Sequence, residues 1–325
     1  MCKGDVLLVA AGKSSLTKDK KTRSLYFVNN LTYTLMNLPG LVLTILFGVL
    51  PLFGLLLAFK NFNYVDGIFG SPWCGLDQFK NLFYSDDLWR CLRNTVFYSI
   101  SKVITLNIIM GVLVALLLYE VRNKIAFKIY QTTMLLPSFM SWAIIGYIVF
   151  ALLSYDDGLA NQLLEFIGIE PILWYDTPIA WPFIITISIL WKDSGMSSIY
   201  YYSCLLSIDP CLFEAAAIDG AGKLKQIWHV SIPVLKPMLA MCLITQVGNI
   251  LASGYDVMYS LTLNSSSLRS TTDNFGMYML RMLKGGTDSF GRGTAMNILN
   301  SLVSMMLVRG INQLVKKYDS SLAMF

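Results

Sequence analysis

Six apolar segments, each close to the length needed to cross a membrane, place the strongest constraint on how this chain can fold. A helix rises about 1.5 Å per residue, so roughly 20 apolar residues are needed to cross a hydrocarbon core about 30 Å thick. The segments are 38–59, 95–118, 129–153, 179–206, 234–255 and 294–315. The sequence therefore predicts an all-α, polytopic membrane protein with six transmembrane helices. Pro137 in the third segment and Pro237 near the start of the fifth are expected to kink or delimit their helices.

The composition agrees with a membrane location and excludes an ordinary soluble domain. Hydrophobic residues make up 55% of the 325 residues and charged residues only 14%, which is too apolar for a soluble chain of this length. The net charge of +5 could suggest a nucleic acid as partner, but the basic residues flank one membrane face while an outer loop, 156–176, is acidic. This distribution indicates membrane topology and contact with lipid, and no nucleic-acid surface.

The distribution of Lys and Arg also predicts the orientation, because positively charged loops remain in the cytoplasm. With the N-terminus inside, 15 of the 25 Lys and Arg residues fall in inner segments and 8 in outer segments, while Lys102 and Lys192 lie within spans. We therefore predict that both termini are cytoplasmic. The expected organisation is a cytoplasmic segment 1–32, a transmembrane domain 33–318 and a cytoplasmic tail 319–325.

No residue pattern predicts an enzyme or a cofactor site in this chain. The six cysteines are scattered and there is only one histidine, so a zinc or iron–sulfur site is not expected. Gly12-Lys13-Ser14 lacks the upstream glycine of a phosphate-binding loop, so no nucleotide site is expected either. Cys74 and Cys91 share the first outer loop, and for them two free thiols are favoured over a disulfide.

A polar loop, 208–237, interrupts the apolar sequence between the fourth and fifth spans and is predicted to lie in the cytoplasm. Asp209 supplies a side-chain acceptor at a helix N-cap, and Pro210 has the backbone angle that suits the first helical turn. Gly220 suits the left-handed residue that ends a helix. The loop is thus expected to contain a short helix of about ten residues.

One face of this short helix is suited to contact with another protein. Phe213, Ala216 and Ala217 share the face, and the two small residues allow a close backbone approach. Glu214 lies off this face, where it can pair with a basic group of a partner. The alternative is a helix resting on lipid headgroups, which usually carries Lys or Arg. Residues 210–220 contain neither, so docking to a protein is favoured.

These residues resemble a known family motif. Glu214-Ala215-Ala216, Asp219-Gly220 and Ile232-Pro233 resemble the EAA loop of binding-protein-dependent ABC importer permeases, with Val230 and Ile232 as mild departures. Much of the remaining chain looks like the Lpl-type polysaccharide permeases, a branch of the maltose-type carbohydrate importers. The matching stretches include Leu38-Pro39-Gly40, Ala58-Phe59-Lys60, Gly70-Ser71-Pro72-Trp73, Trp191-Lys192, Ile199-Tyr200 and Ile208-Asp209-Pro210.

The resemblance implies a maltose-type (MetI-like) permease fold with a cytoplasmic coupling helix, in a bacterial plasma membrane. It implies four partners: a second, homologous permease chain, a cytoplasmic ABC ATPase dimer that holds ATP and Mg²⁺, an extracellular lipid-anchored solute-binding protein, and an oligosaccharide or polysaccharide fragment as substrate. It also implies that the ATPase is contacted by the coupling residues Phe213, Glu214, Ala215, Ala216, Asp219, Gly220 and Pro233.

Charges within the spans suggest where the solute passes. Lys102, Lys192 and Asp193 are placed in apolar segments, where a charge costs roughly 2.5 to 3.5 kcal/mol on insertion scales and should face a cavity or a partner. Functional use is favoured, and a structural charge pair between spans is the alternative. The resemblance places the family's sugar-contacting turn on Lys192, Asp193 and Met196, although the family carries other residue types there.

Further path candidates combine an aromatic ring with amides and hydroxyls, which suit sugar faces and sugar hydroxyls respectively. They are Trp191, Gln246, Asn249, Ser253 and Tyr255. Trp and Tyr also anchor membrane interfaces, and amides and hydroxyls also bind helices together, so both interpretations stay open. The outer segment 261–292 is long enough to meet the binding protein, with a plain solvated loop as the alternative.

Two other functions compete with oligosaccharide import. A permease for another solute class, such as amino sugars, glycerol phosphodiesters or peptides, would carry the same EAA loop. An ion-coupled secondary transporter would need an acid at the membrane midplane, and Asp193 is the residue that keeps this alternative open.

Overall fold

The structure is a computed structural model that describes residues 33–102, 109–249 and 254–318. The regular structure in these ranges is helical, and the one β-type contact there is an isolated bridge between Lys60 and Trp73. The all-α prediction is therefore confirmed. The chain divides into two units, Met1–Leu56 and Leu57–Phe325, which are described separately.

The described part of the first unit belongs to one apolar helix. This helix, Tyr33–Phe59, is 27 residues long and continues a few residues past the unit boundary. It includes a π-helical turn, Ile45–Val49, and ends in a 3₁₀ stretch, η2 (Leu50–Phe59). Its large apolar side chains are mostly exposed, which is the surface that a helix presents to lipid.

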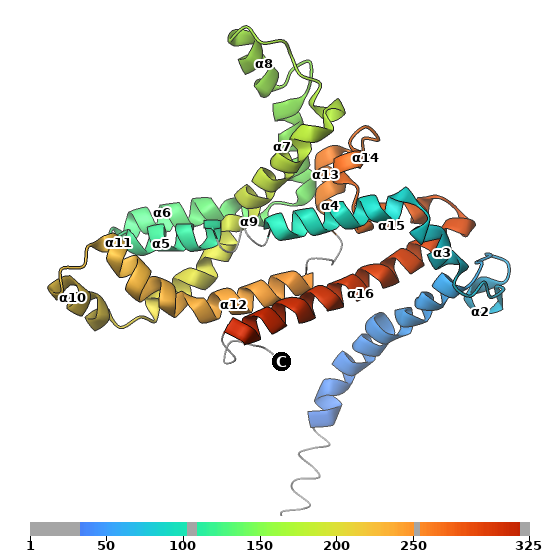
Figure 1. The fold of residues 1–325 in the computed structure, drawn as a ribbon, viewed down its shortest axis with the longest axis horizontal. Helices are drawn as coiled ribbons and strands as arrows, with labels where there is room; N and C mark the ends of the chain where they lie inside the picture. Colours follow the sequence, from blue (N-terminus) through green and yellow to red (C-terminus); the bar gives the residue numbers. More distant parts are fainter. Residues whose placement is uncertain (1–32, 103–108, 250–253, 319–325) are drawn as a thin grey trace, which may run out of the picture. The chain divides into compact units, whose positions relative to one another are not determined.

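The second unit is a set of helices joined by short turns (Figure 1). Their bounds are α2 (Gly67–Gly70), α3 (Asp77–Phe83), α4 (Asp86–Lys102), α5 (Val112–Glu120), α6 (Lys124–Leu135), η4 (Leu136–Phe139), α7 (Trp142–Leu153), α8 (Leu159–Phe166), η5 (Trp174–Asp176), η6 (Pro178–Ala180), α9 (Trp181–Leu206), α10 (Pro210–Ile218), α11 (Lys223–Gln226), η7 (Ile227–Ser231), α12 (Ile232–Asn249), α13 (Tyr255–Thr262), α14 (Arg269–Thr272), α15 (Phe275–Lys284) and α16 (Thr287–Tyr318).

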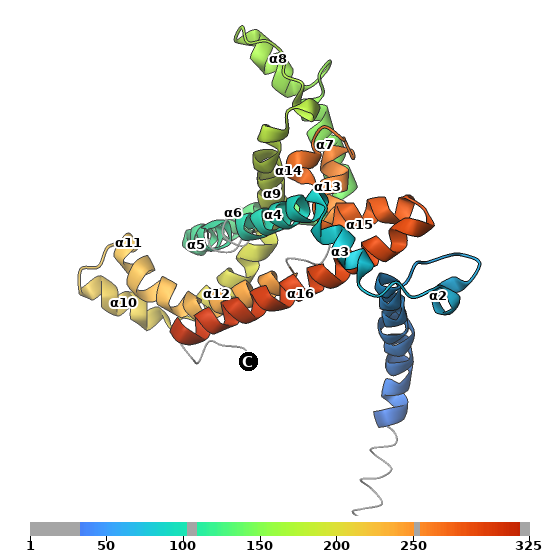
Figure 2. The ribbon, with the colours of Figure 1, turned by 45° about the vertical axis from the view of Figure 1, so that its right-hand side comes forward.

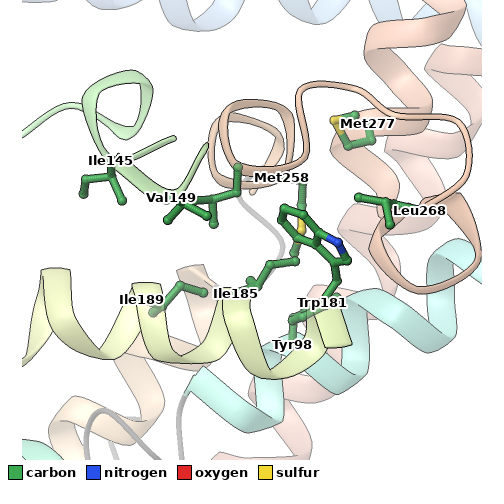
Figure 3. Close-up of a cluster of buried hydrophobic side chains, with 10 residues drawn as sticks. Tyr98, Ile145, Val149, Trp181, Ile185, Ile189, Met258, Leu268 and Met277 are labelled. Atoms are coloured by element: carbon green, nitrogen blue, oxygen red, sulfur yellow. The ribbon is translucent and has the colours of Figure 1, made fainter. Parts of the chain in front are cut away.

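Helix α9, 26 residues long, is the element around which the second unit packs. It contacts α4, α5, α6, α12, α13 and η4. Near its N-terminus, Trp181 and Ile185 are fully buried beside Met258 of α13 and Val149 of α7 (Figure 3). The Trp181 indole Nε1–H donates to the carbonyl oxygen of Trp174 at 2.8 Å, so the buried ring is also satisfied as a donor.

Two further apolar clusters hold the remaining helices. One joins α4, α15 and α16 through residues such as Cys91, Tyr278 and Met296. The other joins the C-terminal half of α9 to α5 and α12 through Tyr201, Leu205 and Leu235. Helices α12 and α16 also pack together and run side by side in both views (Figures 1 and 2).

Three helices in the described ranges are long and apolar enough to cross a membrane: Tyr33–Phe59, Lys223–Gln246 and Ser289–Lys317. They overlap the first, fifth and sixth predicted spans, although the second of these helices begins at Lys223, inside the predicted loop 208–237. The fourth predicted span corresponds to α9, and the second, 95–118, is described only at its ends because residues 103–108 lie outside the described ranges.

The third predicted span, 129–153, is a bent pair of helices. Lys124–Phe139 and Trp142–Leu153 are bent by 98° at a short break. Pro137 sits in the 3₁₀ turn before the break, where it lacks an N–H for helical hydrogen bonding. Ser141 then caps the next helix by accepting from Ile144 N at 3.4 Å. The kink expected at Pro137 is thus confirmed.

The segment 261–292, predicted to be an outer loop, is folded rather than a plain solvated loop. Asp273, whose side chain is fully buried, accepts two hydrogen bonds from Arg281 at 2.6 and 2.7 Å and one from Arg90 Nη2 at 3.1 Å. Burial lowers the pKa of Arg281, but the hydrogen bonds and charge of Asp273 raise it by more. The buried carboxylate therefore joins α15, which belongs to this segment, to α4. Cys74 and Cys91 are both free thiols, as favoured from the sequence.

Candidate coupling helix and translocation path

The predicted short helix is present as α10, with the caps expected from its sequence. Asp209 Oδ1 accepts a hydrogen bond from Cys211 N at 2.9 Å, and this bond holds the pKa of Asp209 below its ordinary value. Pro210 is the first helical residue. Gly220 adopts a left-handed φ of 76°, and Ala221 N donates to Ala216 O at 2.9 Å. The chain therefore turns sharply at the end of α10.

The face of α10 expected to meet a partner is divided in the structure. Phe213 packs against Tyr119 of α5, with ring centroids 5.9 Å apart, and joins the apolar cluster of α5, α9 and α12. Ala216 is half-buried, whereas Ala217 is exposed. Phe213 therefore attaches α10 to its own chain, because α10 lies against the end of α5.

The rest of α10 presents an apolar surface around one carboxylate. Glu214 and Ala215 are exposed, and Glu214 forms no ion pair with any residue in the described ranges. Ile218 is 87% exposed and Leu224 in α11 is 74% exposed. We call Leu212, Glu214, Ala215, Ile218 and Leu224 the docking face. Exposed apolar groups beside a free charge are typical of a protein contact surface.

The segment after α10 is attached to α5 a second time. Lys223 Nζ donates to Glu120 Oε2 at 2.8 Å and to Oε1 at 3.0 Å. Asp219 is the C-cap residue of α10, and Pro233 is exposed near the start of α12. Lys223 to Gln246 then form one long helix that passes through the π-helical turn η7.

Lys192 is buried in α9 and faces the break between α6 and α7. It is 8% exposed, and its ammonium donates to the carbonyl oxygens of Met140 at 2.5 Å, Ser138 at 3.0 Å and Pro137 at 3.4 Å. It also lies 5.4 Å from the ring centroid of Trp142. Pro137 O also accepts from Met140 N at 3.1 Å, so Lys192 matters most for the carbonyls of Ser138 and Met140 at the break.

Asp193, the next residue, faces a different element because successive helical residues point about 100° apart. Its Oδ2 lies 3.8 Å from Lys102 Nζ of α4, and both side chains are partly exposed. The pairing of charges between spans, considered from the sequence, is therefore observed for Asp193. Met196 is one turn further along α9 and is also exposed, so Asp193 and Met196 share a face.

At Gly195 the backbone of α9 comes very close to that of α6. A Cβ atom placed on Gly195 would lie 2.1 Å from the carbonyl oxygen of Met134 and 2.5 Å from its carbon. Only glycine allows this contact without moving a backbone. Gly195 and Lys192 are one turn apart on α9. Gly195 therefore packs against the end of α6, and Lys192 binds the carbonyls of η4 that follow it.

The other path candidates are not gathered into one site. Trp191 is 46% exposed on a different side of α9 from the buried Lys192. Gln246 is half-buried in α12, and Tyr255 is exposed at the start of α13. The side chain of Asn249 and all of Ser253 lie outside the described part of the chain.

Comparison with protein families gives one match. Residues 107–317 match the family described as "Binding-protein-dependent transport system inner membrane component". The matched range begins before α5, ends within α16, and includes α9 and α10.

Similar proteins and structures cover nearly the whole chain. The polygalacturonan/rhamnogalacturonan transport system permease protein YteP of Bacillus subtilis is 35% identical over 93% of this chain and 93% of its own. The protein LplB of the same organism is 31% identical over 98% and 96%. The crystal structure of a bacterial ABC transporter involved in the import of the acidic polysaccharide alginate matches with a TM-score of 0.80 and 30% identity, covering 94% of this chain and 99% of that one.

Replacement of Lys192 by Met should destabilise the protein much more than replacement of Asp193 by Asn. The first change removes the donor from the carbonyls of Ser138 and Met140 at the break, and each buried unsatisfied polar group costs about 1–3 kcal/mol. The second weakens a partly exposed charge pair worth less than about 1 kcal/mol. The measurement is thermal unfolding of the purified protein in one detergent. Equal melting temperatures for the two variants would contradict the role assigned to Lys192.

Proposed function

The chain belongs to the family of inner membrane components of binding-protein-dependent transport systems, and we propose that it imports an oligosaccharide or a polysaccharide fragment. The observation that carries the proposal is the capped helix α10 with an exposed docking face, in a chain whose relatives YteP and the alginate importer are named for polysaccharide substrates. The protein performs no bond chemistry and is the permease subunit of the transporter.

Energy for transport is proposed to come from a separate cytoplasmic ABC ATPase dimer that binds ATP and Mg²⁺. The docking face would insert into a cleft of one ATPase subunit, where Glu214 pairs with a basic group. Exposed apolar side chains at Leu212, Ile218 and Leu224 would supply the buried area of this contact. Closure of the ATPase dimer would then move α10 and switch the pore between two packed states.

Two further partners complete the proposed transporter. A second, homologous permease chain would form the other half of the pore. An extracellular, lipid-anchored solute-binding protein would deliver the saccharide. The solute-binding protein as a partner is supported by the structure of the bacterial alginate ABC transporter in complex with an alginate pentasaccharide-bound periplasmic protein. That structure matches this chain with a TM-score of 0.78 and 29% identity.

The sugar path is proposed to run along the face of α9 that carries Asp193 and Met196. Both residues are accessible, and Asp193 is beside Lys102. Trp191, Gln246, Asn249, Ser253 and Tyr255 remain candidates for contacts along the path. Lys192 is proposed to act through the backbone that it binds, because its ammonium already donates to three carbonyls.

The alternatives predict different energy sources and solutes. A permease for amino sugars, glycerol phosphodiesters or peptides would use the same docking face, and uptake assays with the cognate binding protein separate these solutes. An ion-coupled transporter would lose activity when ion gradients collapse, even with ATP present. The pairing of Asp193 with Lys102 weighs against this second alternative, because the carboxylate already has a cationic partner.

Glu214→Lys should abolish ATP-driven saccharide uptake by the assembled transporter in proteoliposomes. The change places a positive charge where a basic group of the ATPase is proposed to bind, and unfavourable charges at an interface cost several kcal/mol. Glu165→Lys is the matched control, because Glu165 is an exposed glutamate of α8, in a predicted outer loop. Uptake by the Glu214→Lys variant at the rate of the control would refute the docking role.

The orientation proposed from the charges places α11 in the cytoplasm and α14 outside. In a chain freed of its native cysteines, Lys223→Cys should resist a membrane-impermeant thiol reagent in intact cells and react after lysis. Arg269→Cys should react in intact cells, because Arg269 is exposed in α14. The reverse labelling pattern would show that the topology is inverted.

A further inference from the structure

A cavity of about 500 Å³ lies apart from the coupling helix and from α9. It is lined by Asn61, Phe62, Gln78, Asn81 and Arg292. Asn61 and Phe62 follow η2, Gln78 and Asn81 belong to α3, and Arg292 belongs to the first part of α16. By the proposed orientation, this cavity is on the outer side of the membrane.

Gln78, which lines the cavity, is held in place by packing and by a hydrogen bond. Gln78 is 9% exposed, and its Nε2 donates to Asn61 Oδ1 at 3.1 Å. Gly291 makes room for this amide, because a Cβ atom there would lie 3.0 Å from the Gln78 side chain and 3.2 Å from Leu57 O. The side chain that supports Asn61 is therefore fixed by packing, which preorganises the amide oxygen and nitrogen atoms for a ligand.

The segment that supplies Asn61 is itself held in place. Asn61 N donates to Pro72 O at 3.0 Å, and Cys74 N donates to Phe59 O at 2.9 Å. Lys60, buried beneath, donates to the carbonyl oxygens of Phe69 at 2.6 Å and Ile68 at 3.1 Å. The cavity thus has a firm frame on the side of the 60–74 segment.

Aromatic rings border the cavity at Phe62. Phe62 meets Phe290 edge-on with centroids 5.6 Å apart, and Tyr64 contacts both rings at 5.3 and 6.0 Å. Tyr64 is exposed. An exposed aromatic surface beside amides offers an apolar face for a sugar ring together with partners for its hydroxyl groups.

Arg292 adds a specific charge to this arrangement. It is exposed, and its guanidinium forms no ion pair or hydrogen bond with any side chain that the structure describes. A guanidinium binds a carboxylate through two parallel hydrogen bonds, which makes it more selective for that group than a lysine. A cavity that offers an aromatic face, amides and one guanidinium matches a sugar that carries a carboxylate.

We propose that this cavity is an outer subsite for a uronate unit of the transported saccharide, with the sugar carboxylate on Arg292 and its hydroxyls on Asn61 and Asn81. The proposal rests on the proposed saccharide import and adds the acidic class of the substrate. It agrees with the relatives, since alginate is named as an acidic polysaccharide and YteP is named for polygalacturonan. A neutral saccharide would use the same amides and rings without the guanidinium.

The test compares an acidic with a neutral probe on the whole transporter in nanodiscs, without the binding protein. The probes are a galacturonate trisaccharide and a galactose trisaccharide, titrated by ligand-observed NMR. The protein should bind the acidic probe at least about tenfold more tightly, since hydrogen bonds to charged groups are worth this much. Arg292→Met should remove that preference and leave binding of the neutral probe unchanged. Asn81→Ala should weaken binding of both probes.

Arg269→Met is the matched control, because it removes another exposed arginine and should change neither affinity. Arg292→Lys keeps the charge and should retain part of the preference for the acidic probe. This variant separates the loss of the guanidinium from misfolding as the cause of any change in Arg292→Met. Equal binding of both probes by the unaltered protein, or an unchanged preference in Arg292→Met, would overturn the subsite. If the complete transporter with its binding protein imports no saccharide of either kind, the proposed function itself fails. If it imports them and Arg292→Met takes up the acidic one normally, only the subsite fails.

Discussion

A helix that breaks inside a membrane leaves main-chain carbonyls without partners, and here one lysine satisfies them. Lys192 binds three carbonyls at the bend between α6 and α7, where water is not available to do so. Gly195 lets the backbones of α9 and α6 touch one turn later. Because both residues belong to α9, the bent pair has a fixed relation to the helix that also packs on α5, α12 and α13. The buried ammonium of Lys192, which would be costly without partners, thereby connects α9 to the bend between α6 and α7.

The same helix leads directly to α10, the proposed coupling helix. Ser207, Ile208 and Asp209 separate α9 from α10, and Ile208 is buried in the cluster with α5 and α12. Phe213 on Tyr119 then fixes α10 to α5. The Lys223–Glu120 pair is exposed and contributes little energy, so the apolar contact is the main attachment. A displacement of α10 would therefore be passed to α5 and α9 rather than absorbed in a flexible loop.

Features that depend on neighbouring residues could be predicted from the sequence, and features that depend on distant ones could not. The caps at Asp209 and Gly220 follow from local backbone chemistry, and three of the predicted spans overlap long apolar helices in the described residues. The partners of Lys192 lie more than 50 residues away along the chain, so the sequence showed only that this charge needed a partner. The cavity at Arg292 brings residues 61–62 and α3 together with the first part of α16. No local pattern marks such a meeting, and none marks the contact between Phe213 and Tyr119.

The central claim is that α10 is the contact through which an ATPase drives this permease. Cys211 is a native, exposed cysteine of α10, and a photoreactive maleimide can be placed on it once the other cysteines are replaced. Illumination of the assembled transporter should join this chain to the ATPase subunit, while the same probe on Arg269→Cys should not. An intact transporter in which the probe at Cys211 reaches lipid or another subunit, but never the ATPase, would contradict the account.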